Sequence, residues 1–510
     1  MLIKKDKIEE RDYQKNIFES AKDVNTLVVL PTGLGKTIIS VLMSDYRISK
    51  FSGSKVLFLA PTKPLVNQHY KTFFSLMDAV MNHVSGDIKK EDRKKIYETS
   101  QIIFATPQTI ENDMENGTVD FSDFSLLVVD EAHHTIGNYS YVKIAQRFTA
   151  YSKHPLILGL TASPASDREK IRLICNNLDI KNIEIRSEDD PDVKPYIKAK
   201  LIQEIRLPLP KEILEISSGL KNIIIEQIAS LQNLGLMKNV PVSRINRVTI
   251  LMLQKSLQKR MFAGARNGYT IRGIIATSKI LKLYHALNLI STQSVESFSK
   301  FAGKIIKQGT AKTDKELAKT PEFVDLYERA SKLLDEGIEH PKIAETIRIL
   351  KEYLNKDKRA IIFTQYRDSV DTICSHLLKI EGIRPVKFIG QGKGGLSQKD
   401  QINIIKDFEA GVNNVLVSTS VSEEGMSIRG ADVAIFYETI PSGIRAIQRR
   451  GRVGRFGAGR IFILIAEDTN DEGYYWVAKK RESSMKKIIK DIKANPESLR
   501  NDGTLKGFVR

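Results

Sequence analysis

Short apolar runs recur in two separate blocks of the sequence, and this pattern constrains the fold more than any other feature. In the first block they are 26–30, 56–60, 102–105, 126–130 and 156–160, each followed by a polar or glycine turn and a helix-like stretch. The second block repeats the pattern at 360–363, 386–389, 415–418, 433–437 and 461–466. Such runs, separated by helical segments, are typical of buried parallel strands. The sequence therefore predicts an α/β protein with two parallel sheets.

The segment between the two blocks, roughly 200 to 340, has a different period. Apolar residues recur there at every third or fourth position, as in 223–237 and 248–262, which predicts amphipathic helices. At 510 residues the chain is too long for a single hydrophobic core. We therefore expect a helical insert domain between two sheet domains.

Positive charge is concentrated in that insert. The chain has a net charge of +18, and the segment from Leu231 to Ile290 contains ten Lys and Arg residues but no Asp or Glu. A positive field attracts nucleic acid or an anionic membrane surface, although a run of one sign is also common on an ordinary solvated helix face. No apolar stretch reaches the ~18 residues that span a bilayer, and the N-terminus does not resemble a signal peptide. We expect a cytoplasmic protein and favour nucleic acid over membrane.

The two cysteines predict no metal or disulfide chemistry. Cys175 and Cys374 lie far apart and have no nearby Cys or His companions at metal-ligand spacing.

The first apolar run leads directly into PTGLGKT (31–37). Gly33 and Gly35 let backbone N–H groups turn inward around phosphate, in a loop that also holds Thr32 and Leu34. Lys36 is expected to reach the β- and γ-phosphates of ATP and Thr37 its Mg²⁺. The general motif begins with a glycine where this chain has Leu30, yet the strand, glycine loop and helix pattern still predict a Walker A loop.

Asp130 ends the run 126–130, and with the adjacent Glu131 it begins the tetrapeptide DEAH (130–133). Asp130 is expected to hold Mg²⁺, and Glu131 to orient or deprotonate the attacking water. Adjacent acids at a strand end are often only a solvated turn, but a DEAH tetrapeptide after a Walker A loop is more specific.

Arg452 and Arg455 lie three residues apart in QRRGRVGR (448–455). A helical start would project both toward one anion, which makes them candidate arginine fingers for ATP hydrolysis. An ordinary basic helix start is the alternative.

Several motifs, taken in order, resemble a superfamily 2 helicase. They are DYQ (12–14), LPTGLGKT (30–37), APTKPLVNQ (60–68), ATPQT (105–109), DEAH (130–133), LTASP (160–164), IIFTQYRDS (361–369), STSVSEEGMSI (418–428) and QRRGRVGR (448–455). More narrowly, TPQTIEND, DEAHHTIGNY, SEDDPDVKPY, DEGYYW and the long helical insert resemble the helicase part of the archaeal Hef proteins. That family is related to the Fanconi anaemia M translocase and, more distantly, to Dicer-type helicases and antiviral RNA sensors.

This resemblance implies roles for further residues of the nucleotide site. It makes Gln14 the reader of the adenine edge, places Gly425 at the nucleotide and Gln448 near the γ-phosphate, and assigns coupling of ATP to movement to His133, Thr161 and Ser163. The family commonly has an acid near the ribose where this chain has Ser427, so we expect altered nucleotide affinity rather than lost activity.

The resemblance also implies a groove over both sheets that contacts a nucleic-acid strand. Its expected residues, each of which could singly be a helix cap or turn residue, are Thr62, Lys63, Thr106, Pro107, Gln365, Tyr366, Ser418 and Thr419. In the insert, the residues expected to grip phosphates are Arg244, Arg247, Lys255 and Lys259.

These patterns lead to one domain scheme. The fold class is α/β, with two RecA-like parallel-sheet domains and a helical insert domain between them. The expected divisions are an ATP-binding RecA-like domain at 1–200, a thumb-like DNA-binding insert at 201–338, a second RecA-like domain at 339–480 and a helical tail at 481–510.

Two expectations concern the C-terminal end. Hef proteins often carry a nuclease, but only about 45 residues follow 461–466, so cutting activity is not expected. The tail DGTLKGFV (502–509) resembles the clamp-binding pattern Q-x-x-L-x-x-F-F through Leu505 and Phe508, with Asp502 in place of Gln, which makes a sliding clamp a candidate partner.

The resulting hypothesis is an ATP- and Mg²⁺-dependent DNA helicase or translocase that remodels or unwinds branched DNA such as stalled forks. One alternative is an RNA-directed superfamily 2 ATPase, because contacts to the sugar-phosphate backbone do not by themselves distinguish DNA from RNA. The other is a nucleic-acid clamp without catalysis, against which the intact Lys36, Glu131, Arg452 and Arg455 argue.

Overall fold

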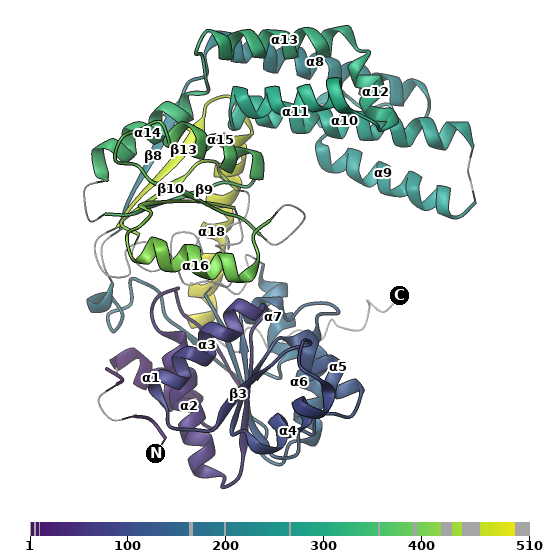
Figure 1. Cartoon of the computed structure of the whole chain (residues 1–510). Helices are drawn as coiled ribbons and strands as arrows, with labels where there is room; N and C mark the ends of the chain where they lie inside the picture. Colours follow the sequence, from purple (N-terminus) through teal and green to yellow (C-terminus); the bar gives the residue numbers. More distant parts are fainter. Residues whose placement is uncertain are drawn as a thin grey trace.

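Two sheet-containing domains lie one above the other, and a helical domain projects sideways from the upper one (Figure 1). The structure is a computed structural model, and it describes residues 2–4, 7–9, 11–162, 167–197, 200–264, 267–354, 358–390, 395–419, 431–440 and 459–494. The predicted α/β fold of two parallel-sheet domains with a helical region between them is confirmed.

The first sheet has seven parallel strands in the order β3-β4-β2-β5-β6-β1-β7. They are β1 (Thr26–Val29), β2 (Lys55–Leu59), β3 (Met81–Val84), β4 (Ile102–Ala105), β5 (Phe124–Asp130), β6 (Ile157–Thr161) and β7 (Asn182–Ile185). The helices are α1 (Asp12–Ala21), α2 (Lys36–Lys50), α3 (Lys63–Leu76), α4 (Lys90–Thr99), α5 (Pro107–Glu115), α6 (Ser140–Tyr151) and α7 (Arg168–Asn177). Side chains alternate between two cores, so that Leu27 joins the cluster on one face and Val28 that on the other. Burial on both faces explains why the five inner strands read as continuous apolar runs, whereas the edge strands β3 and β7 are only partly buried and lack such a run.

The second sheet has six parallel strands in the order β10-β11-β9-β12-β13-β8. They are β8 (Lys200–Leu207), β9 (Ala360–Phe363), β10 (Pro385–Phe388), β11 (Val415–Ser418), β12 (Val433–Phe436) and β13 (Gly459–Ala466), with the helices α14 (Pro341–Tyr353), α15 (Arg367–Leu377) and α16 (Gln398–Glu409). Strand β8, nearly all of which falls in the stretch assigned to the insert by sequence, pairs with β13 at the edge of this sheet. The chain therefore enters the second sheet before the insert and returns to it afterwards.

The insert is a bundle around its own hydrophobic core. Its helices are α8 (Lys211–Asn233), α9 (Arg247–Phe262), α10 (Gly268–Thr292), α11 (Val295–Gln308), α12 (Lys312–Ala318) and α13 (Pro321–Asp335). The end of α10 is embedded in the second sheet domain, where Gln293 is fully buried. Its side-chain oxygen accepts hydrogen bonds from Ser369 Oγ at 2.8 Å and Thr364 Oγ1 at 3.3 Å, and its carbonyl accepts one from Tyr437 Oη at 2.6 Å. Because the fully buried Gln293 finds these hydrogen-bond partners in the second domain, the contact fixes the insert to that domain.

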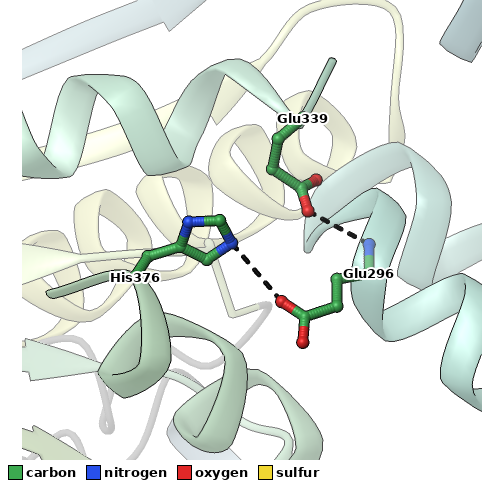
Figure 2. A group of neighbouring side chains, drawn as sticks. All are labelled: Glu296, Glu339 and His376. Carbon is green, nitrogen blue, oxygen red and sulfur yellow. Dashed lines mark hydrogen bonds and ion pairs between the residues drawn. The ribbon is translucent and has the colours of Figure 1, made fainter. Parts of the chain in front are cut away.

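A second polar joint fixes α11 to the same domain (Figure 2). The Glu339 carboxylate accepts hydrogen bonds from the backbone N–H groups of Val295 at 2.5 Å and Glu296 at 3.1 Å, so it caps the first turn of α11. Glu296 also lies 3.4 Å from His376 Nε2 on α15 and 2.5 Å from Lys300 Nζ. The three side chains have metal-ligand chemistry, but the Glu339 carboxylate already serves as a helix cap and that of Glu296 as an ion-pair partner.

The long helix α18 (Asn470–Ala494) connects the second domain to the first. Near its start, Asp471 is buried beside Lys342 in the second domain. Near its end, Ile492 joins the core of the first domain, and Lys493 Nζ lies 2.6 Å from Asp190 Oδ1. The helix thus begins before residue 481, where the sequence placed a tail, and its far end packs on the first sheet domain. Within the described residues, no helix is both long and apolar enough to cross a membrane.

Candidate active site and nucleic-acid groove

The phosphate-loop residues lie where parallel strand β1 ends and α2 begins. Gly33 and Gly35 have φ of +89° and +79°, a left-handed conformation that favours glycine. Gly35 is the N-cap of α2 and has no capping side chain, so the first N–H groups of α2 face the loop. Lys36 Nζ donates a hydrogen bond to the Leu30 carbonyl at 3.0 Å. The half-buried Thr32 lies in the same turn. This geometry is that of an anion-binding loop.

Two side chains of α1 support the loop from behind. Tyr13 Oη and Gln14 Nε2 both donate hydrogen bonds to the Leu34 carbonyl, at 2.6 and 3.2 Å. A Cβ added to Gly35 would lie 2.4 Å from Gln14 Nε2. The sequence assigned Gln14 to the adenine, and in this structure it holds the phosphate loop. Tyr13 was not singled out from sequence, although it sits in the same DYQ motif.

His69 joins the two residues predicted to hold the metal. Its Nε2 lies 2.8 Å from Asp130 Oδ2 and its Nδ1 lies 3.4 Å from Thr37 Oγ1. The imidazole is buried and packs against Phe58, with ring centroids 4.5 Å apart. Sequence reasoning missed His69, which directly follows the APTKPLVNQ motif on α3. No local pattern signalled this residue, because its partners are brought in by β1 and β5.

Glu131 is connected to the end of β6 through His133. His133 Nδ1 lies 3.2 Å from Glu131 Oε2 and 3.2 Å from Thr161 Oγ1. Glu131 has a φ of +51°, so the chain turns sharply as β5 ends. Burial alone would raise the pKa of the Glu131 carboxyl, but the hydrogen bond and charge of His133, with the charge of Lys36, hold it below its usual range. Glu131 is therefore ionised at neutral pH, and His133 lies between it and the predicted coupling residue Thr161.

The predicted groove residues of the first domain lie at the same edge of its sheet as the phosphate loop. Thr62 and Thr106 are the N-cap residues of α3 and α5, directly after β2 and β4, and neither hydroxyl caps its helix. The Thr106 hydroxyl instead lies 3.0 Å from that of Thr109. Lys63 is half-exposed at the start of α3 and pairs with Asp87, while Pro107 opens α5. Both helices thus begin where the neighbouring strands β2 and β4 end, with their N-termini at the same edge of the sheet.

The second domain presents its predicted groove residues unequally. Gln365 is exposed after β9, whereas Ser418 and Thr419 are buried at the end of β11. Tyr366 packs against the insert: Asn288 Nδ2 donates to its hydroxyl at 3.0 Å, and its ring lies 5.3 Å from that of His285. A nucleic-acid contact for these four residues stays a prediction, and Tyr366 has a structural contact with α10 in any case.

The ten basic residues between Leu231 and Ile290 differ in their exposure. Seven of the ten are exposed, namely Lys238, Arg244, Arg247, Lys255, Lys259, Arg260 and Arg272. Lys279 is buried, and burial lowers its pKa, while Lys282 pairs with Asp314 of α12. Arg266 lies outside the described residues.

Other predicted site residues also lie outside the described part of the chain. They are Ser163, Gly425, Ser427, Gln448, Arg452, Arg455 and the segment 502–509. The part of the nucleotide site that the second domain is expected to supply therefore remains a prediction from sequence.

Three family models match the chain. Residues 7–166 match the type III restriction enzyme res subunit, and residues 342–457 match the helicase conserved C-terminal domain. Residues 211–333 match a helical-bundle family whose description names an ATP-dependent RNA helicase. The matches coincide with the first sheet domain, the second sheet domain and the insert.

A solved structure is similar over almost the whole chain. It is the crystal structure of the Pyrococcus furiosus Hef helicase domain, with a TM-score of 0.71 and 38% sequence identity, covering 93% of this chain and 99% of that one.

Curated relatives also match over most of this chain. A Methanocaldococcus jannaschii protein described as an ATP-dependent RNA helicase is 40% identical over 96% of the chain and 62% of its own length. The mouse Fanconi anemia group M protein homolog is 32% identical over 96% of the chain and 26% of its own length. The fission yeast ATP-dependent DNA helicase fml1 is 32% identical over 89% of the chain and 57% of its own length. The chain thus spans between about a quarter and three fifths of these relatives.

Proposed function

Because this chain belongs to the Hef and Fanconi anaemia group M type of superfamily 2 helicases, we propose that it is an ATP-dependent DNA helicase or translocase acting on branched DNA. The observation that carries this proposal is the chain of contacts that joins the phosphate loop, the two acids and the end of β6. Through His69 and His133, a change at the nucleotide reaches both Asp130 and Thr161.

The described residues can supply the phosphate-binding and water-orienting groups for ATP hydrolysis. The loop N–H groups and Lys36 bind the phosphates, since they surround the N-terminus of α2. Glu131 is an ionised carboxylate beside that loop and orients the attacking water. Arg452 and Arg455 complete the site by stabilising charge on the transferred phosphoryl group.

The donors at Thr37 and Asp130 fit Mg²⁺. A hydroxyl and a carboxylate are the hard oxygen ligands that this ion prefers, and here one imidazole connects them. Mg²⁺ would neutralise phosphate charge when bound. The residues themselves orient the oxygens, and His69 keeps the Asp130 carboxylate directed toward the loop.

Branched DNA is the substrate that the relatives and the insert together favour. A relative of the same type is named as a DNA helicase, and the exposed basic residues of the insert lie on the part of the molecule that projects beyond both sheets (Figure 1). Thr62, Thr106 and the N-termini of α3 and α5 would hold one strand by its phosphates. The name of the Methanocaldococcus relative supports RNA as the second candidate.

One assay separates these functions. ATP turnover is measured without nucleic acid and then with single-stranded, duplex and forked DNA and with duplex RNA. We expect the strongest stimulation by forked DNA, abolished in Lys36→Ala and in Glu131→Gln. Equal rates with every ligand would refute the motor, while stimulation by RNA alone would establish the RNA-directed alternative. Binding of forked DNA without any ATP turnover would establish the other alternative, a nucleic-acid clamp without catalysis.

The sliding clamp remains a separate proposal based on sequence alone. A peptide of residues 500–510 is expected to bind a clamp through Leu505 and Phe508. The same peptide with Leu505→Ala and Phe508→Ala is expected not to bind. Equal binding by both peptides would contradict it.

A further inference from the structure

Helix α9 uses only one of its faces for packing. Ile250 and Leu257 are its buried residues: Ile250 belongs to the insert core, Leu257 lies next to Gly273 of α10, and α10 is the described element against which α9 mainly packs. Ile250 and Leu257 are seven residues apart, so they lie on the same side of the helix. The opposite side faces away from the bundle.

That outer side carries a regular row of side chains. Val248, Met252, Lys255, Lys259 and Phe262 are spaced four, three, four and three residues apart, which places them on one helix face. We call this row the α9 ridge. Val248, Met252 and Phe262 are 57%, 68% and 81% exposed, and Phe262 is the most exposed of the large apolar side chains in the described part of the chain. Single exposed apolar residues are ordinary, but three in register with two lysines are not.

The ridge is free of compensating negative charge. No Asp or Glu occurs between residues 231 and 290. Within the described part of the chain, neither Lys255 nor Lys259 forms an ion pair, in contrast to Lys282 on α10. The ridge therefore combines two unpaired cations with apolar residues on either side of them along one helix.

This combination of apolar and basic side chains matches an unpaired nucleic-acid strand better than a duplex. An intact duplex presents phosphates and sugars outward and keeps its bases stacked inside, so it offers little for Met252 or Phe262 to contact. A strand whose bases are unstacked presents both apolar base faces and phosphates, and proteins bind it by combining aromatic platforms with basic grooves. An acidic amphipathic protein helix would also suit the ridge. The exposed basic residues, however, extend beyond it to Arg244 and Arg272, which one such helix would not cover.

We propose that the α9 ridge binds unpaired nucleotides next to a branch point, with bases against Val248, Met252 and Phe262 and phosphates against Lys255 and Lys259. The proposal rests on the proposed function, because it identifies which part of a branched substrate the insert recognises. It assigns the preference for branched over plain duplex DNA to apolar contacts, and general affinity to the lysines.

The test compares the full chain with two double variants on three DNAs. The variants are Met252→Ala with Phe262→Ala, and Lys255→Ala with Lys259→Ala. The DNAs are a duplex, a fork with unpaired arms, and the same fork with abasic sites at the branch point, which keeps every phosphate. Dissociation constants are measured by fluorescence anisotropy at several salt concentrations. Phe74→Ala, at a 61% exposed site on α3, is the matched apolar control.

The two variants are expected to differ in kind. Loss of Met252 and Phe262 should weaken fork binding about 10-fold, leave duplex binding and the salt dependence unchanged, and make no difference on the abasic fork. Loss of the two lysines should weaken binding to all three DNAs and reduce the slope of log affinity against log salt by about 2. Phe74→Ala should behave as the unchanged protein.

Three outcomes would overturn the proposal. They are unchanged fork affinity after loss of Met252 and Phe262, an equal loss on duplex and fork, or an abasic fork that binds the unchanged protein as tightly as the intact fork. ATP turnover of the unchanged protein with the fork is measured in parallel. If the fork does not stimulate ATP turnover, the proposed function itself is refuted. If it does stimulate turnover but the Met252 and Phe262 substitutions leave fork binding unchanged, only the inference about α9 is refuted.

Discussion

His69 Nε2 lies 2.8 Å from the Asp130 carboxylate while its other ring nitrogen lies 3.4 Å from the Thr37 hydroxyl. One buried imidazole thus orients both oxygen donors of the predicted Mg²⁺ site. Groups that orient metal ligands typically matter almost as much as the ligands.

We expect His69→Ala to raise the Mg²⁺ concentration needed for ATP hydrolysis and to lower turnover by about 10- to 100-fold. His69→Gln should recover part of the loss, because its amide can still donate to Asp130. Mg²⁺ titrations of turnover, and of the affinity for a fluorescent ATP analogue, provide the measurement. His83→Ala, at an exposed position of β3, is the control. An unchanged Mg²⁺ requirement in His69→Ala would contradict the positioning role.

Gly35→Ala should weaken ATP binding more than Gly33→Ala does. Both positions have positive φ, which costs an alanine about 1–2 kcal/mol. At Gly35 the new Cβ would also approach Gln14 Nε2 to 2.4 Å, whereas nothing lies within 4 Å at Gly33. Because Gln14 is buried and bonded to the Leu34 carbonyl, it cannot move without disturbing the loop. Affinities for a fluorescent ATP analogue measure the difference, and equal losses would show that Gln14 is free to move.

Lys342→Met should destabilise the second domain by about 3–5 kcal/mol, because it leaves the buried Asp471 carboxylate without its cation. Lys342 also donates to the Thr292 carbonyl at 2.8 Å, so the insert should loosen too. A double variant with Asp471→Leu should lose less. Urea unfolding followed through Trp476, the single tryptophan and the seventh residue of α18, measures these effects. A double variant less stable than Lys342→Met would show that the hydrogen bonds of Asp471 to the backbone of Ala466 and Thr439 outweigh the cost of its unpaired charge.

His340 should make the same domain sensitive to acid. Burial, with the charge of Lys342, lowers the pKa of its imidazole from 6.5 to about 3. Because the folded value lies below the unfolded one, the unfolded chain takes up the proton first. The stabilisation is therefore complete above pH 6.5 and is lost as the pH falls toward 3, at up to ~1.4 kcal/mol per pH unit.

His340→Asn keeps a capping side chain at the start of α14 but cannot titrate. We expect its free energy of unfolding, measured through Trp476 fluorescence between pH 7.5 and 5, to fall less steeply than that of the unchanged protein. Parallel curves would mean that His340 gains a proton in the folded state at an ordinary pKa.

Local patterns were sufficient for five strands of each sheet and for the phosphate loop, but not for the edge strands β3, β7 and β8. Strands buried on both faces must be apolar throughout, so β1 and β5 were visible as runs, and the phosphate loop and the two acids follow these runs directly in the sequence. The carboxyl ends of parallel strands all lie at one edge of the sheet, so the loops that follow them lie there whatever the strand order. The helical period of the insert was visible for the same reason.

Contacts between distant segments were not visible in this way. Strand β8 has mostly exposed residues because it lies at a sheet edge, so it lacks the apolar run that marks a central strand. Helix α18 shows a helical pattern, but nothing in its own sequence says that Ile492 packs into a core formed some three hundred residues earlier.

The sequence by itself determined that this chain has two parallel sheets, a phosphate loop with its two acids and a basic helical insert. Each of these is encoded by spacing within a short segment. Only the tertiary structure decided that His69 joins Thr37 to Asp130, that the insert is anchored in the second domain through Gln293, and that Lys255 faces outward while Lys279 does not. Periodicity shows which side of an element is buried. The partner that buries it depends on how the whole chain packs.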